Sequence, residues 1–382
     1  MSLPVDFRYT ELTESELALR EEVRAFLAAE LPPQSRARAH PFNEKNAEFT
    51  AKMATKGWVG MALPKEYGGH SRTAVERFIV VEEMLAAGAP VGAHWVADRQ
   101  SGPSILRFGS EEQKQRFLPG IARGEIWFSI GMSEPDAGSD LAAVATRAQK
   151  VEGGWVLNGT KIWTSGAHEN HWFIVLCRTA PFEGDKHNGL SQLLVDLRSE
   201  GLKVNPIRFL DGTHHFNEVV MTDVFVPDEN LLGEAGMGWH QVNNELSFER
   251  AGPERFLFSY LVFENWLREL ARAPTRPETE MIGRLGAKYS TLRQLSLTVS
   301  RAIDEGRAPA VEAALLKDVG TVFSQQVTDA VRAICDLEPS LDTASAAEFQ
   351  LAQVTLIGPS FTIAGGSSEV LRTVAARGLQ RR

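Results

Sequence analysis

The chain has 382 residues, which is enough for two or three domains with sizeable cores. Its net charge of −9 at pH 7 argues against sequence-independent nucleic-acid binding, which needs a basic surface. No apolar run is long enough for a membrane span, and the N-terminus shows no basic or apolar leader. With only two cysteines, Cys177 and Cys335, we expect a cytoplasmic protein in which both are small buried apolar residues.

The first third of the sequence is expected to be helical. Thr13 and Glu16 form a capping box ahead of an amphipathic run. Apolar residues at helical spacing predict one buried face: Leu19, Val23, Phe26 and Leu27. Pro32 and Pro33 end this helix. Residues 74–88 and 111–125 are expected to form further helices, and residues 63–70, ahead of both, are expected to form a loop.

The pattern changes to β after about residue 126. Asn158-Gly159 stands between two short runs rich in β-branched and aromatic residues, which predicts a hairpin turn at that dipeptide. Four more strand-like runs follow, at residues 171–179, 189–197, 202–209 and 216–227. We expect a small β-barrel or sandwich in this part of the chain.

The helical period returns after Trp239. One apolar stripe marks a long helix: Leu285, Tyr289, Leu292, Leu295 and Val299. The chain is therefore expected to be mainly α with a central β domain. We divide it into an N-terminal helical domain at 1–126, a middle β domain at 127–235 and a C-terminal helical bundle at 236–382.

Two histidine-containing stretches do not support a metal site. In "HENH", His168 and His171 are three residues apart and lie between expected strands, whereas the zinc motif needs them four apart on a helix. We expect surface polar residues there. His214 and His215 have no partner cluster in the sequence.

The stretch "GMSEPDAGSDLAA", residues 131–143, resembles the first signature of the acyl-CoA dehydrogenase family. Further stretches resemble other motifs of that family in the same order, between about residues 12 and 380. They are "LPKEYGGH", "GSEEQKQRFLPGIARGE", "NGTKIWTSGA", "VFVPDENLLGEAGMGW" and "TIAGGSSEVLRTVAARGL". The resemblance implies an N-terminal helical domain, a middle β-barrel and a C-terminal four-helix bundle.

The resemblance also implies an enzyme that uses FAD to convert an acyl-CoA into the trans-2-enoyl-CoA. A base removes a proton from Cα while a hydride leaves Cβ for flavin N5. Hydrogen bonds to the thioester carbonyl must stabilise the developing enolate charge. An electron-transferring flavoprotein is the implied electron acceptor, and a homo- or hetero-oligomer is the implied assembly.

The resemblance also implies roles for single residues, at the positions that match the family's motifs. Trp163 matches the aromatic residue that packs against the flavin ring, and Ser165 matches a hydroxyl near N5. Ser139 matches a contact to the CoA chain. The other positions that match flavin neighbours are Ile130, Met132, Ser133, Ser367, Ser368 and Glu369.

The catalytic base needs a separate argument. Many members carry it as a glutamate at the position of Gly365, whose N–H remains able to donate to the thioester, with Gly366 beside the substrate. Members of the isovaleryl-CoA dehydrogenase type carry it on a helix just before an arginine, which matches Glu249 and Arg250. Pro253 must start or kink a helix there, and this break aims the carboxylate inward.

Several alternatives stay open. Glu245 and Glu254 are rival candidates for the base. The alternative to a catalytic role is that Glu249 is a solvent-exposed charged residue on a helix. Two family motifs that hold a neighbouring subunit's FAD, Arg-x-x-Phe-Gly and Gln-x-x-Gly-Gly-x-Gly, are missing. The chain can therefore be a competent dehydrogenase, a subunit that completes a heteromer, or a flavin oxidase or monooxygenase on the same fold.

The acyl group is the least determined feature. Residues 91–109 are expected to border the acyl pocket. His94, Asp98 and Arg99 are unusually polar for a simple fatty chain, which favours a bulky, branched or ring-bearing acyl group. The alternative is that these three residues face solvent.

Overall fold

The computed structural model describes residues 5–32, 44–181, 184–249 and 252–380. Clustering of contacts divides the chain into two compact units. The helical unit comprises residues up to Glu44, Arg72–Pro90 and the chain from Glu249 onward. The sheet unit comprises Lys45–Ser71 and Val91–Phe248. No helix in the described part is long and apolar enough to cross a membrane.

The helical unit is built from segments at both ends of the sequence. Its helices are α1 (Glu14–Glu30), α4 (Ala74–Ala86), α8 (Glu254–Leu257), α9 (Tyr260–Glu269), α10 (Arg276–Asp304), α11 (Ala310–Ile334), α12 (Ala346–Phe361) and α13 (Ser368–Gln380). The capping box of α1 is confirmed, because the Thr13 side chain accepts the N–H of Glu16 and the Glu16 carboxylate accepts the N–H of Thr13. The expected buried face of α1 is confirmed as well.

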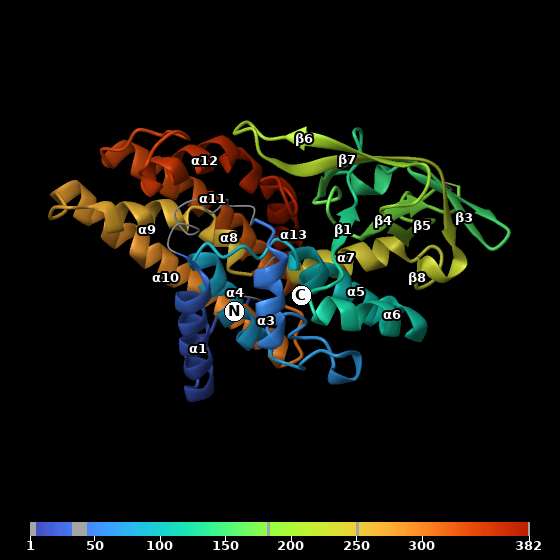
Figure 1. The fold of residues 1–382 in the computed structure, drawn as a ribbon, viewed down its shortest axis with the longest axis horizontal. Coiled ribbons are helices and arrows are strands. Elements are labelled where there is room, and N and C mark those ends of the chain that lie inside the picture. Colours follow the sequence, from blue (N-terminus) through green and yellow to red (C-terminus); the bar gives the residue numbers. More distant parts are fainter. Residues whose placement is uncertain (1–4, 33–43, 182–183, 250–251, 381–382) are drawn as a thin grey trace. The chain divides into compact units, whose positions relative to one another are not determined.

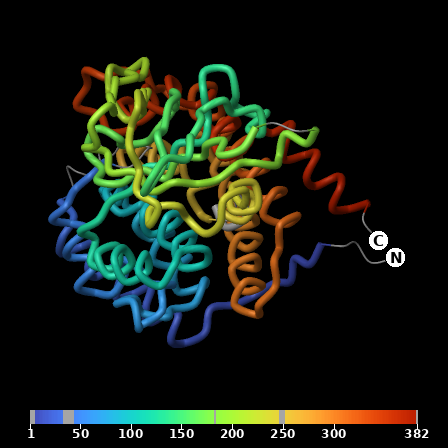
Figure 2. The backbone as a smooth tube through the Cα atoms, turned by 90° about the vertical axis from the view of Figure 1, so that its right-hand side faces the viewer, coloured from blue at the N-terminus to red at the C-terminus, as the bar shows by residue number. Residues whose placement is uncertain are grey.

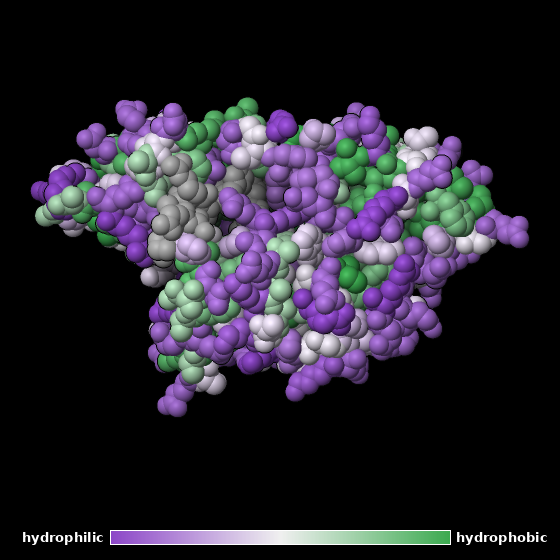
Figure 3. All heavy atoms as spheres, in the orientation of Figure 1, coloured by the Kyte–Doolittle hydropathy of each residue, from purple (hydrophilic) through white to green (hydrophobic). Residues whose placement is uncertain are grey.

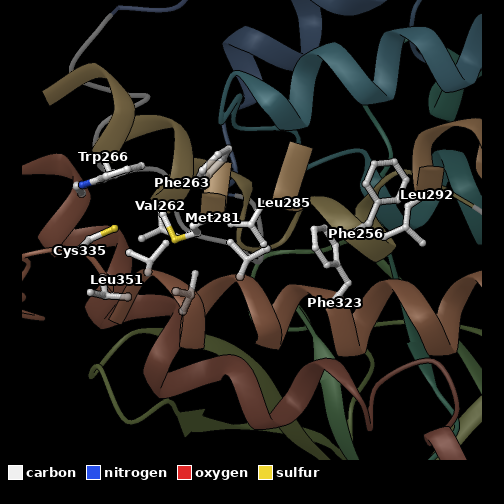
Figure 4. Close-up of a cluster of buried hydrophobic side chains, with 14 of the residues drawn as sticks. Phe256, Val262, Phe263, Trp266, Met281, Leu285, Leu292, Phe323, Cys335 and Leu351 are labelled. Atoms are coloured by element: carbon white, nitrogen blue, oxygen red, sulfur yellow. The ribbon is translucent and has the colours of Figure 1, made fainter. Parts of the chain in front are cut away.

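The core of the helical unit lies between α8, α9, α10, α11 and α12 (Figure 4). Leu285, Leu292 and Val299 of the expected stripe are buried in it, and Tyr289 and Leu295 pack against it. Cys335 lies in the same cluster, and Cys177 is buried in the core of the sheet unit. Both cysteines are free and buried, as expected, and burial raises the pKa of each thiol to about 12.

The sheet unit combines one mixed sheet with short helices. Its strands are β1 (Phe128–Gly131), β2 (Arg147–Val151), β3 (Gly154–Ser165), β4 (Trp172–Arg178), β5 (Leu190–Asp196), β6 (Leu202–Arg208), β7 (His214–Pro227) and β8 (Leu231–Leu232). Its helices are α3 (Ala47–Thr55), η1 (Lys65–Tyr67), η2 (Ala97–Ser101), α5 (Gly102–Phe108), α6 (Glu111–Ala122), η3 (Leu141–Ala143), η4 (Asp228–Asn230) and α7, which runs to the unit boundary (Gly238–Glu249).

The strands follow the order β6-β7-β3-β2-β4-β5-β8, and β1 pairs in parallel with β4. Figure 2 shows these strands as one green-to-yellow layer, with the teal helices α5 and α6 along it. Phe117 and Ile121 of α6 pack with Phe128, Ile174 and Leu194 of the sheet, which explains why this face is apolar. The expected fold class, mainly α with a central β domain, is confirmed.

The expected hairpin turn at Asn158-Gly159 is wrong. β3 continues through both residues, and the turn from β2 to β3 lies earlier, where Gly153 has φ +74°. The Asn158 side chain is bonded to Asp223 of β7 through both its oxygen and its nitrogen, each at 2.9 Å. The β3–β7 register shifts between Leu157 and Gly159. The dipeptide therefore marks a bulge within a long strand rather than a turn.

Candidate functional site

The flavin positions of the sheet unit gather where β1 ends and β3 passes beside it. The backbone N–H of Ile162 donates to the carbonyl of Ser133 at 2.9 Å. The hydroxyl of Ser129 donates to the carbonyl of Ser165 at 2.8 Å. These bonds join the two segments that carry the expected flavin residues, which are Ile130, Met132, Ser133, Trp163 and Ser165. The expected CoA contact, Ser139, is exposed on the loop that leads to η3.

Trp163 is held at a β-bulge in a left-handed backbone conformation. Lys161 pairs with Val219 and Thr164 pairs with Asn217, so two residues of β3 face one residue of β7. Trp163 has φ +60°, which costs a non-glycine residue about 1–2 kcal/mol. Its side chain is 54% exposed. Strain of this kind collects at binding sites, because packing elsewhere keeps it in place.

The surface around this tryptophan has the mixed apolar and polar character that the expected flavin site needs. Hydrophobic side chains reach the surface of the sheet unit (Figure 3). Its exposed large apolar residues include Trp163, Leu210, Phe225 and Met237. Next to Trp163, Met132, Ser133 and Ser165 are half-buried and offer both apolar and hydroxyl contacts. A planar ring with an apolar face and polar edges matches an exposed aromatic platform of this kind.

The second group of expected residues lies in the helical unit, in the turn between α12 and α13. Gly365 has φ +71° and Gly366 has φ +99°, which glycine adopts without steric cost. Ser367 precedes α13, and its hydroxyl accepts the N–H of Val370 at 3.5 Å. The backbone N–H of Glu369 itself and then the Ser367 side chain lower the pKa of the Glu369 carboxyl.

A buried lysine holds this glycine turn. Lys317 of α11 is 0% exposed and donates from Nζ to the carbonyl of Gly366 at 2.6 Å. The ammonium thus links the turn to a helix that starts more than fifty residues earlier in the sequence. A charged donor holds a carbonyl more firmly than a neutral donor does.

We expect Lys317→Met to lower the free energy of unfolding by about 1–3 kcal/mol, because the half-buried carbonyl of Gly366 loses its charged donor. Urea denaturation followed by circular dichroism measures this change. The matched control is Lys288→Met on α10, an exposed lysine that donates to Gln326 at 2.7 Å. This control is expected to change stability by less than about 0.5 kcal/mol. Equal stability of Lys317→Met and the wild type would contradict the role of Lys317.

The expected base lies at a helix end. α7 ends at Glu249 and α8 begins at Glu254, with Pro253 as the residue before it. The expected helix break at Pro253 is confirmed. The rivals Glu245 and Glu254 are both buried. Arg250 lies outside the described residues, and only the backbone of Glu249 is described. Glu249 and the glycine turn belong to the helical unit, whereas the flavin positions around Trp163 belong to the sheet unit.

The polar residues expected at the acyl pocket lie on and before η2, which is a π-helical turn. His94 and Arg99 are buried, so the alternative that these side chains face solvent is wrong for both. Asp98 accepts the backbone N–H of Gly60 at 2.7 Å. Arg99 lies over the ring of Trp95, with its guanidinium carbon 4.2 Å from the ring centroid. These contacts explain why polar residues occur here, since their side chains interact with other residues of the sheet unit.

His94 should make stability fall in mild acid. Its Nδ1 is 3.0 Å from the hydroxyl of Thr50, and burial lowers its pKa to about 4, while Asp98 opposes this change. Between about pH 6.5 and pH 4, the unfolded chain binds a proton that the folded chain does not, so stability falls as pH falls by up to roughly 1.4 kcal/mol per unit. Above pH 6.5 the contribution is constant.

Urea denaturation between about pH 7 and pH 4.5 measures this slope. His94→Asn keeps a hydrogen-bonding group for Thr50 but has no titrating ring. We therefore expect its unfolding free energy to fall less steeply with falling pH, by the contribution of one proton. A slope identical to that of the wild type would show that His94 does not titrate as described.

Sequence patterns missed four buried polar residues near the expected site. They are Glu134 and Lys161, which bond to each other, Asn217, which donates to the carbonyl of Thr164, and Lys317. A lone lysine in a strand or helix is usually solvated. A signal was present for Lys161, since the alternation from Trp155 and Leu157 through Gly159 places it on the buried face of β3. The stacking of His168 and His214, with ring centroids 3.8 Å apart, had no such signal.

Comparison with known proteins decides the family. Models of the acyl-CoA dehydrogenase N-terminal, middle and C-terminal domains match residues 13–125, 129–224 and 236–380. The chain belongs to the acyl-CoA dehydrogenase family. The family consists of FAD-dependent oxidoreductases, so the expected cofactor and enzyme class are confirmed.

Several relatives are similar over nearly the whole chain. Acyl-CoA dehydrogenase FadE34 of Mycobacterium tuberculosis is 31% identical over 94% of this chain, and the chain spans about half (48%) of that relative's length. The solved structure of the Tcur3481-Tcur3483 steroid ACAD is 30% identical, with a TM-score of 0.87 over 99% of this chain and 100% of that one. The ChsE4-ChsE5 complex of M. tuberculosis is 28% identical, with a TM-score of 0.81 over 98% and 100%.

Proposed function

We propose that this acyl-CoA dehydrogenase family member oxidises a ring-bearing acyl-CoA to the trans-2-enoyl-CoA, with Glu249 as the base. The observation that carries this proposal is the strained, exposed Trp163, presented beside Ser165 on the sheet unit. An exposed aromatic platform of that kind is suited to packing against a flat ligand. The helix that ends at Glu249 supplies a carboxylate at the position that some family members use.

The reaction breaks two C–H bonds and forms one C=C bond. The Glu249 carboxylate takes the Cα proton, and the electron pair released there forms the new double bond. Bound FAD supplies the acceptor for the hydride that leaves Cβ. The N–H of Gly365 donates to the thioester carbonyl, where negative charge develops as the proton leaves. A carboxylate beside an apolar acyl chain has a raised pKa, which suits a base near neutral pH.

The remaining expected residues are assigned to binding. Trp163 packs on the flavin ring, and Ser165 donates to its polar edge. Ser139 contacts the CoA chain. The segments that border the flavin are Ile130, Met132, Ser133, Ser367, Ser368 and Glu369, and the substrate neighbours are Arg250 and Gly366. Support for these roles comes from the half-buried or exposed positions of most of these residues, while Ser368 is buried.

A ring-bearing acyl group, such as one derived from a steroid, is the substrate class that we favour. A similar solved protein is named as a steroid ACAD. Gly365 and Gly366 carry no side chains at the position where other members place a glutamate, which leaves room beside the thioester. The polarity of His94 and Asp98 does not add support, because both side chains are bonded within the sheet unit.

Assembly with a related chain is the second proposal about function. The two motifs that hold a neighbouring subunit's FAD are missing from this sequence. The similar Tcur3481-Tcur3483 and ChsE4-ChsE5 structures each carry the names of two proteins. A partner chain can supply the residues that the pyrophosphate needs. An electron-transferring flavoprotein is the acceptor that we propose for the electrons.

The test is the visible spectrum of the purified protein, recorded without oxygen before and after adding acyl-CoAs. The probes are straight-chain thioesters of short, medium and long length and the CoA thioester of a steroid with a short carboxylate side chain. We expect a yellow protein that the steroid thioester bleaches fastest. Fastest bleaching by a straight-chain thioester would overturn the substrate class.

Two other outcomes test the remaining parts of the proposal. A colourless protein that turns yellow only when co-expressed with a related chain would support the heteromer. A yellow protein whose reduced form is reoxidised by oxygen within the turnover time would favour an oxidase or monooxygenase over a dehydrogenase.

A further inference from the structure

A buried ion pair lies next to the flavin positions of the sheet unit. Lys161 is 0% exposed and donates from Nζ to Glu134 at 2.8 Å and to the carbonyl of Met132 at 2.9 Å. Glu134 also accepts the backbone N–H groups of Ala145 at 2.6 Å and Thr146 at 2.9 Å. Burial raises the pKa of Glu134, but Lys161 and these backbone donors together lower it by more than burial raises it. This carboxylate is therefore ionised.

This lysine ties the bulge to the segment after β1. The Lys161 ammonium binds the carbonyl of Met132, and the N–H of the next residue, Ile162, binds the carbonyl of Ser133. Two consecutive residues of β3, Lys161 and Ile162, therefore donate to the carbonyls of two consecutive residues, Met132 and Ser133. Trp163 follows directly, in its left-handed conformation. A residue stays in such a conformation only when its neighbours are fixed.

A second buried side chain holds the other end of the bulge. Asn217 of β7 is 0% exposed and donates from Nδ2 to the carbonyl of Thr164 at 3.0 Å. Its Oδ1 lies 2.8 Å from Nε2 of His214, whose ring stacks on that of His168. Trp163 is thus flanked on both sides by residues whose backbone is bonded to buried polar groups.

We propose that Lys161, held by Glu134, is a positioning residue that presents Met132, Ser133 and Trp163 to the flavin. This inference rests on the proposed flavin site. Lys161 itself is fully buried and reaches the flavin only through the Met132 carbonyl and the bulge. Loss of the ion pair frees the segment after β1 and lets the bulge relax, which moves Trp163 away from the position that a flavin ring needs.

The test compares the wild type with the double variant Lys161→Met/Glu134→Gln, which removes both charges together and leaves no unpaired ion in the core. The FAD dissociation constant is measured by titrating FAD into protein from which flavin has been removed. Hydrogen exchange of the Ile162 and Trp163 amides is measured on the same flavin-free protein. We expect the dissociation constant to rise about tenfold or more, the size of effect that follows from a small misplacement of a contact residue. We expect both amides to exchange faster.

A matched control separates positioning from stability. Arg272→Met/Glu278→Gln removes another ion pair, in the helical unit, in which a buried glutamate is bonded to Arg272 at 2.8 and 2.9 Å. This control is expected to lower the thermal midpoint while leaving the FAD dissociation constant unchanged. If the double variant at Lys161 and Glu134 does not fold, Lys161→Arg carries the test, because it keeps a positive charge beside Glu134 but changes the geometry of the donor to the Met132 carbonyl.

The outcomes are distinguishable. A folded variant with wild-type FAD affinity and wild-type exchange at Ile162 and Trp163 overturns the positioning role. Weaker FAD binding with faster exchange supports it. If the wild type binds no FAD either alone or when co-expressed with a related chain, the proposed flavin function fails, and exchange of the two amides alone then decides whether Lys161 holds the bulge.

Discussion

Glu249→Gln is expected to slow flavin reduction by an acyl-CoA by about 10²–10⁴-fold, the range for loss of a general base. Glutamine has nearly the same size as glutamate but cannot accept the Cα proton. The thermal midpoint, the FAD spectrum and the dissociation constant for the acyl-CoA should stay close to those of the wild type. Anaerobic stopped-flow measurement of flavin bleaching gives the rate directly.

The rival bases are the controls for this prediction. Glu245 lies one helical turn earlier on α7, and Glu254 begins α8; both are buried. Glu245→Gln and Glu254→Gln should each reduce flavin within about tenfold of the wild-type rate, since neither is assigned to proton transfer. If Glu249→Gln keeps the wild-type rate and one of these variants loses it, the base is that rival.

Trp163→Ala and Trp163→Gly should both weaken FAD binding about tenfold, because both lose an aromatic contact worth about 0.5–1.5 kcal/mol beyond its buried area. The two variants should differ in stability. Glycine adopts φ +60° freely, whereas alanine keeps the left-handed strain, so Trp163→Gly should unfold with a free energy about 1 kcal/mol higher than Trp163→Ala. FAD titration and urea denaturation measure the two effects.

Trp163→Phe is the control that keeps a ring at this position. Phe216 packs edge-on against Trp163, with centroids 6.0 Å apart, and a phenyl ring retains part of that contact. We expect Trp163→Phe to bind FAD within about threefold of the wild type. Equal stability of the alanine and glycine variants would show that the backbone of residue 163 is not left-handed in solution.

Local patterns predicted the elements that depend on neighbours in sequence. The capping box at Thr13 and Glu16, the stripe around Leu285 and the helix break at Pro253 are all present. Each depends on residues within one or two helical turns, so the physical cause is contained in a short window of sequence.

Patterns failed where distant strands decide the conformation. Asn158-Gly159 has the composition of a hairpin turn, but Asp223 of β7 pairs with Asn158 and keeps β3 extended. His94 and Asp98 suggested a polar acyl pocket, yet their partners, Thr50 and Gly60, come from an earlier loop and helix. No short window contains those partners.

The sequence by itself determined the family resemblance, the division into helical and β segments, and the residue types available for chemistry, including Trp163, Glu249 and the glycine pair at 365. These follow from motifs and periodicity. Only the tertiary structure decided that Trp163 is strained and exposed at a bulge, and that Lys161 and Lys317 are buried donors to backbone carbonyls. A bulge exists only relative to its partner strand, and a buried charge is stable only when distant groups satisfy it, so both are properties of the packed chain.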